Sequence, residues 1–140
     1  MVTDRVFVDT NVFVSGLVFN GNEYLLLKLA TFGRVRLVIA DTVLQETRRV
    51  LAEKLPRSGH DLDEFLDVVE YESVPVPDDD VVGRAGEMLR DPNDALILAG
   101  IMVSKPDFAM TGDKDLLTAE IRAAYPVMTC AEYLNLLFRG

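Results

Sequence analysis

Acidic side chains directly follow two apolar segments of this 140-residue chain. Asp9 comes immediately after the run at residues 5–8, and Asp113 comes two residues after the run at 107–111. Both runs have the apolar composition of short buried strands. In an open parallel sheet the functional crevice lies beyond the carboxyl ends of the strands. We therefore expect both carboxylates to face one crevice, where they could bind a hard cation.

Two further acids could complete this cluster. Asp94 lies in the first turn of an expected helix at 93–104, where the helix dipole favours a carboxylate. Glu46 lies on an expected helix at 41–55, about 100° from the centre of its apolar stripe, so its side chain could bend into a neighbouring cleft. Glu53 shares that flank seven residues later and is the alternative to Glu46.

Each of these acids also has an ordinary structural explanation, such as closing a turn, capping a helix or facing solvent. Their expected convergence favours a functional role instead. Clustered carboxylates repel one another and raise one another's pKa, so such a cluster ordinarily persists because a cation occupies it. All-oxygen ligation selects Mg²⁺ or Mn²⁺ over zinc or copper. One or two such ions could provide the activated water and the charge stabilisation that phosphodiester hydrolysis needs.

Strand and helix patterns alternate along the chain. Strands are predicted at residues 5–8, 35–40, 107–111 and 126–129, and helices at 23–32, 41–55, 60–71, 78–90, 93–104, 116–124 and 131–138. This alternation predicts parallel strands joined by right-handed crossovers, hence an α/β fold with an open sheet covered by helices on both faces. The stretch 74–77, Val-Pro-Val-Pro, is expected to be an extended connection. We predict a single domain over residues 1–140.

The composition is that of a folded globular protein, with 49% hydrophobic and 26% charged residues. The longest uncharged apolar stretch, residues 95–103, is less than half of the roughly 20 residues that a membrane span needs. The apolar run between the N-terminus and Asp9 is too short for the hydrophobic region of a secretory signal. Cys130 is the one cysteine, which excludes an intrachain disulfide and a cysteine-rich metal site. We expect a cytoplasmic protein without a membrane segment.

The charge distribution is uneven. The formal net charge of −9 disfavours nonspecific nucleic-acid binding through a general cationic field. However, residues 34–57 carry six basic side chains against three acids, whereas residues 58–94 carry twelve acids against two arginines. Both blocks could be ordinary solvated helix surface. Alternatively, the basic block could hold phosphates, while the acidic block faces solvent or a basic partner.

The chain resembles PIN-domain nucleases over nearly its full length. The opening of that family is matched at residues 8–12, Val-Asp-Thr-Asn-Val, which contain Asp9. The family's second-helix glutamate maps onto Glu46, in Leu-Gln-Glu. Its third acid maps onto Asp94, in Asp-Pro-Asn-Asp-Ala-Leu-Ile-Leu-Ala, and its fourth onto Asp113, in Thr-Gly-Asp-Lys-Asp-Leu. The first motif alone is weak, but all four in this order form a specific signal.

The resemblance implies a three-layer α/β/α sandwich and Mg²⁺- or Mn²⁺-dependent cleavage of RNA, with one or two ions. For many bacterial members it also implies homodimers and the role of the toxin in a toxin–antitoxin pair, which would make an antitoxin a partner. The four acids carry over as catalytic residues and metal ligands, and Asp115 is an additional candidate ligand. The polar candidates near the metal or the phosphate are Thr10, Asn11 and Thr111. Candidates for phosphate contacts from the basic block are Arg49, Arg48 and Arg36.

Three alternatives were weighed. An aspartyl-phosphate phosphatase would need a second Asp two residues after Asp9, where this chain has Asn11. A phospho-acceptor receiver domain would need a lysine after the last strand, and residues 129–132 offer none. The third alternative is a catalytically silent PIN-like module that binds RNA or a protein partner. The sequence does not separate a toxin from a housekeeping ribonuclease.

Overall fold

The computed structural model describes residues 3–139 and is built around a five-stranded sheet. Its strands are β1 (Asp4–Val8), β2 (Val35–Ala40), β3 (Tyr71–Val74), β4 (Phe108–Met110) and β5 (Val127–Met128). They lie in the order β3-β2-β1-β4-β5, and each pair of neighbours is parallel. The predicted parallel sheet is therefore confirmed, and its centre is the first strand of the chain.

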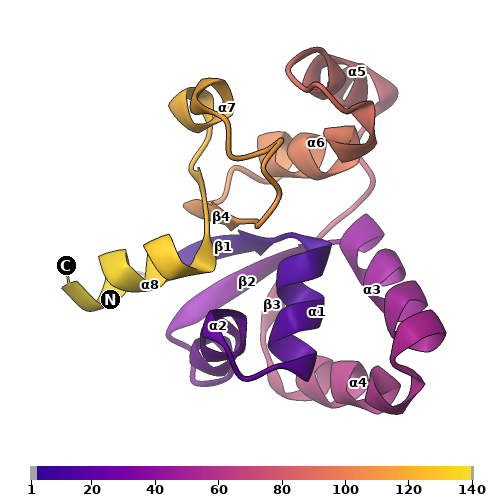
Figure 1. Ribbon diagram of the computed structural model, residues 1–140, viewed down its shortest axis with the longest axis vertical. Helices are drawn as coiled ribbons and strands as arrows, with labels where there is room; N and C mark the ends of the chain where they lie inside the picture. The colour runs from indigo at the N-terminus through magenta and orange to yellow at the C-terminus, as the bar shows by residue number, and fades with distance from the viewer. Residues whose placement is uncertain (1–2, 140) are drawn as a thin grey trace.

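Helices cover both faces of this sheet (Figure 1). From β1 to β3 the chain moves toward one edge, so right-handed crossovers place the intervening helices on one face. The path from β3 to β5 runs the other way and places its helices on the opposite face, which confirms the three-layer prediction. One layer contains α1 (Thr10–Val18), α2 (Asn22–Thr31), α3 (Asp41–Lys54), α4 (Gly59–Val68) and α8 (Cys130–Arg139). The other layer contains α5 (Asp79–Glu87), α6 (Ala95–Ser104) and α7 (Ala119–Ala124).

Helix α6 is buried in the protein and lies close to the sheet. Its residues from Ile97 to Ile101 are buried, and Gly100 allows the close approach, because a Cβ there would lie 3.3 Å from the ring of Phe7 on β1. Since α6 leads back to the start of β4, its first residue faces the carboxyl ends of the strands. No helix in the described chain has both the length and the apolar composition needed to cross a membrane.

One strand and one α-helix of the described chain were not predicted. The expected helix at 60–71 ends at Val68, and Tyr71–Val74 forms the edge strand β3, paired with β2 from Leu37 to Ala40. Only Val74 of β3 is buried, so the strand has no apolar alternation to reveal it. The other element is α1, whose sequence is rich in β-branched residues that disfavour helix. Packing against α2 and α3 outweighs that low propensity.

Candidate metal centre

The centre begins where β1 and β4 end side by side. Because Val8 pairs with Met110, the next residues of the two strands, Asp9 and Thr111, leave the sheet together. The Thr111 hydroxyl donates a hydrogen bond to Asp9 Oδ2 at 2.8 Å. The other carboxylate oxygen of Asp9 accepts from the backbone N–H of Thr10 at 2.6 Å and caps α1. Asp9 is 8% exposed and Thr111 2% exposed, so this carboxylate is fixed by two donors in a nearly closed environment.

Thr111 also fixes the loop that carries Asp113. Its hydroxyl oxygen accepts from the backbone N–H of Asp113 at 3.0 Å. The Asp113 carboxylate in turn accepts from the backbone N–H of Asp115 at 2.9 Å. A single buried hydroxyl therefore connects the carboxylate at the end of β1 with the acidic loop after β4.

Asp94 reaches the same place from the start of α6. Its carboxyl lies close enough to that of Asp113 for this contact to favour a protonated Asp94 when no cation is present. Burial, followed by this contact and by the charges of Asp113, Asp91 and Asp9, raises the pKa of Asp94 to about 7. The desolvated, like-charged environment therefore disfavours the fully ionised cluster and favours a bound cation.

Asp9 and Glu46 complete the set of acids predicted from the sequence. Burial is the main cause that raises the pKa of Asp9, and it outweighs the hydrogen bonds from Thr111 and Thr10. The charges of Asp113 and Glu46 raise this pKa further. Glu46 itself is exposed on α3. The structure thus brings the four acids to one edge of the sheet, with Asp9 inside and Glu46 at the solvent side.

A second grouping extends the centre toward solvent. One carboxylate oxygen each from Asp91, Asp94 and Asp115 lies within 4.8 Å of the other two. Asp115 was expected as an additional ligand, whereas Asp91 was missed. The signal was present in Asp-Pro-Asn-Asp, because residues three apart eclipse across a 3₁₀ turn such as Pro92–Asp94.

The donor set fits a hard divalent cation. All the grouped ligand atoms are carboxylate oxygens, which Mg²⁺ and Mn²⁺ prefer. The Thr10 hydroxyl beside Asp9 is buried and has no hydrogen-bond partner among the described residues. Such a hydroxyl needs a partner such as water, and ions of this class usually retain part of their water shell.

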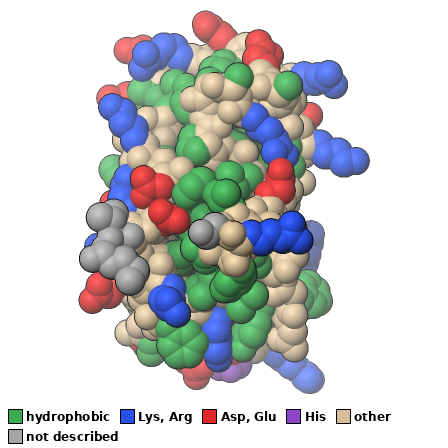
Figure 2. Space-filling model, turned by 90° about the vertical axis from the view of Figure 1, so that its left-hand side faces the viewer, with side chains coloured by type: hydrophobic (Ala, Val, Ile, Leu, Met, Phe, Trp, Pro, Cys, Tyr) green, Lys and Arg blue, Asp and Glu red, His purple; other side chains and the backbone are tan. Residues whose placement is uncertain are grey.

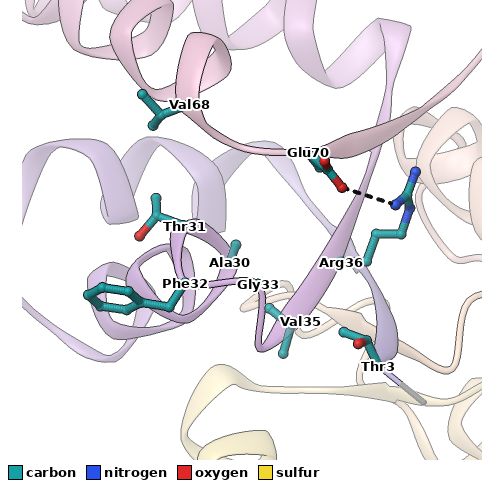
Figure 3. Close-up of a pocket in the computed structure, with 9 residues that line it drawn as sticks. All are labelled: Thr3, Ala30, Thr31, Phe32, Gly33, Val35, Arg36, Val68 and Glu70. Carbon is teal, nitrogen blue, oxygen red and sulfur yellow. Dashed lines mark ion pairs between the residues drawn. The ribbon is translucent and has the colours of Figure 1, made fainter. Parts of the chain in front are cut away.

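The remaining candidates from the sequence lie farther out or are engaged elsewhere. Asn11 is exposed on the first turn of α1. Arg49 forms an ion pair with Glu53 at 3.3 Å, and Arg48 forms one with Asp63 at 2.9 Å. Arg36 lies near the start of β2, at the end of the sheet opposite the acids, and the close-up shows it directed toward Glu70 (Figure 3).

Comparisons with known proteins agree with this fold. The model of a family described as PIN domain matches residues 5–115. The structure of VapBC2 from Rickettsia felis, bound to a DNA fragment from its promoter, superposes with a TM-score of 0.61 at 17% identity over 89% of this chain and 98% of that chain. VapC20 from Mycobacterium tuberculosis, described as a sarcin–ricin loop cleaving toxin, superposes with a TM-score of 0.53 at 18% identity over 86% of this chain and 95% of that chain. No curated protein gives a significant match. At these identities the two likenesses establish the fold.

Proposed function

The chain belongs to the PIN-domain family, and on this premise we propose that it is an endoribonuclease that depends on Mg²⁺ or Mn²⁺. The observation that carries the proposal is the meeting of Asp9, Asp94 and Asp113 at the carboxyl ends of β1 and β4, within electrostatic reach of Glu46. Burial and the neighbouring carboxylates raise the pKa of both Asp9 and Asp94, so this cluster at the strand ends is costly to maintain without a functional cation.

Each acid has a role that follows from its position. The bound cation, or a pair of cations, would supply Lewis-acid activation of water and neutralise charge on the phosphate. Asp9 and Asp113 would hold the principal ion, because Thr111 fixes both. Asp94 would complete the coordination directly or through water, with Asp115 as a further ligand. Glu46, which is exposed, would hold a second ion or orient the attacking water. The family resemblance implies products with 5′-phosphate and 3′-hydroxyl ends.

RNA as substrate and a toxin role are supported by the resemblance of the four acidic motifs and by the fold shared with VapC20, which is described as a toxin. On this proposal the protein is a cytoplasmic toxin and homodimer, neutralised by an antitoxin. Induced expression should then arrest bacterial growth, and Asp9→Asn should abolish the arrest. Light scattering on the purified protein would distinguish a dimer from a monomer.

The central experiment incubates the protein with a short end-labelled single-stranded RNA in Mn²⁺, Mg²⁺ or EDTA. The matched variants are Asp9→Asn and Asp67→Asn, which removes an exposed acid of α4 away from the centre. We expect metal-dependent cleavage by the wild type and by Asp67→Asn, and none by Asp9→Asn. Cleavage that survives both EDTA and Asp9→Asn would contradict the mechanism.

The competing proposal is a silent module that binds RNA or a protein. One observation favours a protein partner over RNA, namely that Arg48 and Arg49 form ion pairs with carboxylates and so are less available to phosphates. The absence of cleavage, together with the absence of Mn²⁺ binding by calorimetry, would support this alternative and exclude the nuclease.

A further inference from the structure

Several cavities on the described surface bring basic and acidic side chains together. Arg36 and Glu70 line one of them, as the close-up shows (Figure 3). A groove beside α2 combines Lys28 with Asp61 and Glu64. In such places the charges largely balance, so an ionic ligand gains little.

A cavity at the end of α6 has a different composition. It measures about 600 Å³, within the usual range for small-molecule sites. Arg84 of α5 and Lys105 after α6 line it, and no carboxylate is present among the described residues of its wall. In a chain with a net charge of −9, a cavity with two cations and no acid is a distinct environment.

The rest of the wall is apolar and aromatic. Ile101 and Met102 contribute from α6, and the half-buried Tyr125 contributes from the end of α7. Figure 2 views the molecule from the left-hand side of Figure 1, where the strands start. On this face hydrophobic side chains gather across the middle, with charged side chains around them. A ligand with a flat apolar body and an anionic group would match this wall.

The negative end of the α6 dipole would ordinarily oppose an anion at this position. The Arg5 guanidinium satisfies two of the carbonyl oxygens at this end, because it donates to Ser104 at 3.0 Å and to Lys105 at 2.9 Å. Its charge is paired with Glu72 at 2.8 Å, so Arg84 and Lys105 supply the positive charge that an anion would meet. The cavity is also separate from the metal centre. Asp94 stands at the other end of α6, and a ten-residue helix is about 15 Å long.

We propose that this cavity binds a nucleotide, with the phosphate held by Arg84 and Lys105 and the base against the ring of Tyr125. Arginine and lysine are the usual phosphate partners, and base–aromatic stacking does not depend strongly on the base. Two sources provide this chemistry: a free mononucleotide, or a nucleotide of an RNA chain whose scissile bond lies elsewhere. The second source rests on the proposed ribonuclease function.

The test is calorimetric titration in EDTA at low salt, with adenosine 5′-monophosphate as the probe. The key variant is Arg84→Gln with Lys105→Asn, because residue 105 has a left-handed backbone (φ 48°) that asparagine tolerates. Lys28→Gln with Arg139→Gln removes two exposed cations outside both the cavity and the basic block of residues 34–57, and is the matched control. Tyr125→Leu removes the ring. Far-ultraviolet circular dichroism verifies folding of each variant.

We expect saturable one-to-one binding by the wild type and by the control. The Arg84/Lys105 variant should bind at least about tenfold more weakly, and Tyr125→Leu should also lose affinity. An uncleaved RNA octamer, titrated into Asp9→Asn protein, distinguishes the sources. If it binds more tightly than the mononucleotide and loses affinity on the same cavity substitutions, the source is RNA.

Three outcomes would overturn the proposal: no binding of either probe, equal affinities for the Arg84/Lys105 variant and the wild type, or binding of decanoate but not of either nucleotide probe. The last result would identify a site for fatty carboxylates. Because the titrations use EDTA or the Asp9→Asn protein, they do not depend on cleavage. Failure of the nuclease and failure of this site are therefore measured separately.

Discussion

Replacement of Thr111 by valine removes one hydroxyl and keeps the shape of the side chain. This hydroxyl donates to Asp9 Oδ2 at 2.8 Å and accepts from the Asp113 N–H at 3.0 Å, in a nearly closed environment. A hydrogen bond to a charged group contributes about 1.5–3 kcal/mol. We therefore expect Thr111→Val to lower the free energy of unfolding by roughly 2 kcal/mol at pH 8 in EDTA.

The loss should be visible in thermal unfolding and in metal binding. For a domain of about this size, 1 kcal/mol corresponds to roughly 2–4 °C, so the melting temperature should fall by about 4–8 °C. Loss of a group that orients a metal ligand typically weakens metal affinity by about 10–100-fold. Titration of Mn²⁺ by calorimetry should therefore show a dissociation constant at least about tenfold higher than that of the wild type.

Thr111→Ser is the matched control, because it keeps the hydroxyl and removes only a methyl group. It should retain metal affinity near that of the wild type. If the valine and serine variants bind Mn²⁺ equally well, the hydroxyl does not position Asp9 and Asp113, and the reasoning fails.

Three other predictions follow from the structure. Gly16→Ala should lower the free energy of unfolding by about 1–3 kcal/mol, because the new Cβ would lie 2.6 Å from Leu27 Cδ1. Urea denaturation measures this change. An unchanged midpoint would show that α1 and α2 can separate at no cost. In EDTA, Asp94 should make the protein less stable as pH rises from about 4 to 7, since its pKa is 3.8 when unfolded and about 7 when folded. Thermal unfolding should then show Asp94→Asn gaining stability relative to the wild type across that range, and a constant difference would contradict the raised pKa. Hydrogen bonds from Arg122, and to a smaller extent from Thr129, lower the pKa of Glu132 from 4.5 to about 2. Ionised Glu132 therefore stabilises the folded protein above pH 4.5, and this stabilisation is lost as the pH falls toward 2. Carboxyl titration by NMR should give that low value, and Arg122→Gln should return it toward 4.5.

The strand ends were the most predictable part of the site. Asp9 and Asp113 follow apolar runs, and these runs are apolar because both faces of a parallel strand are buried. This local pattern is sufficient to predict that both acids lie at the carboxyl ends of strands. The sheet order was not predicted, although it is what puts β1 beside β4 and so places Asp9 next to Thr111. Such pairing depends on contacts between residues about 100 positions apart, and a local sequence pattern carries no information about these contacts.

The parts that were missed share a physical cause. β3 is a short edge strand whose polar residues contact solvent, so its backbone pairing with β2 leaves little trace in side-chain type. Asp91 lies beside Asp94 and Asp115 across the 3₁₀ turn Pro92–Asp94, which stands where the helix was expected to begin. In both cases the backbone geometry, and not residue type, decides the neighbours.

The hydrogen bond between Thr111 and Asp9 joins residues 102 positions apart and so has a consequence for synthesis. As the chain leaves the ribosome, Asp9 emerges first, and its partner hydroxyl on Thr111 follows only 102 positions later, together with the loop of Asp113. β1, in the middle of the sheet, must wait for β4 to cover its second edge. A nascent or prematurely terminated chain that ends before β4 therefore has no assembled carboxylate cluster. On the proposed ribonuclease function, hydrolytic activity would therefore begin only after β4 and the loop of Asp113 have been synthesised, so shorter nascent chains would not cleave RNA.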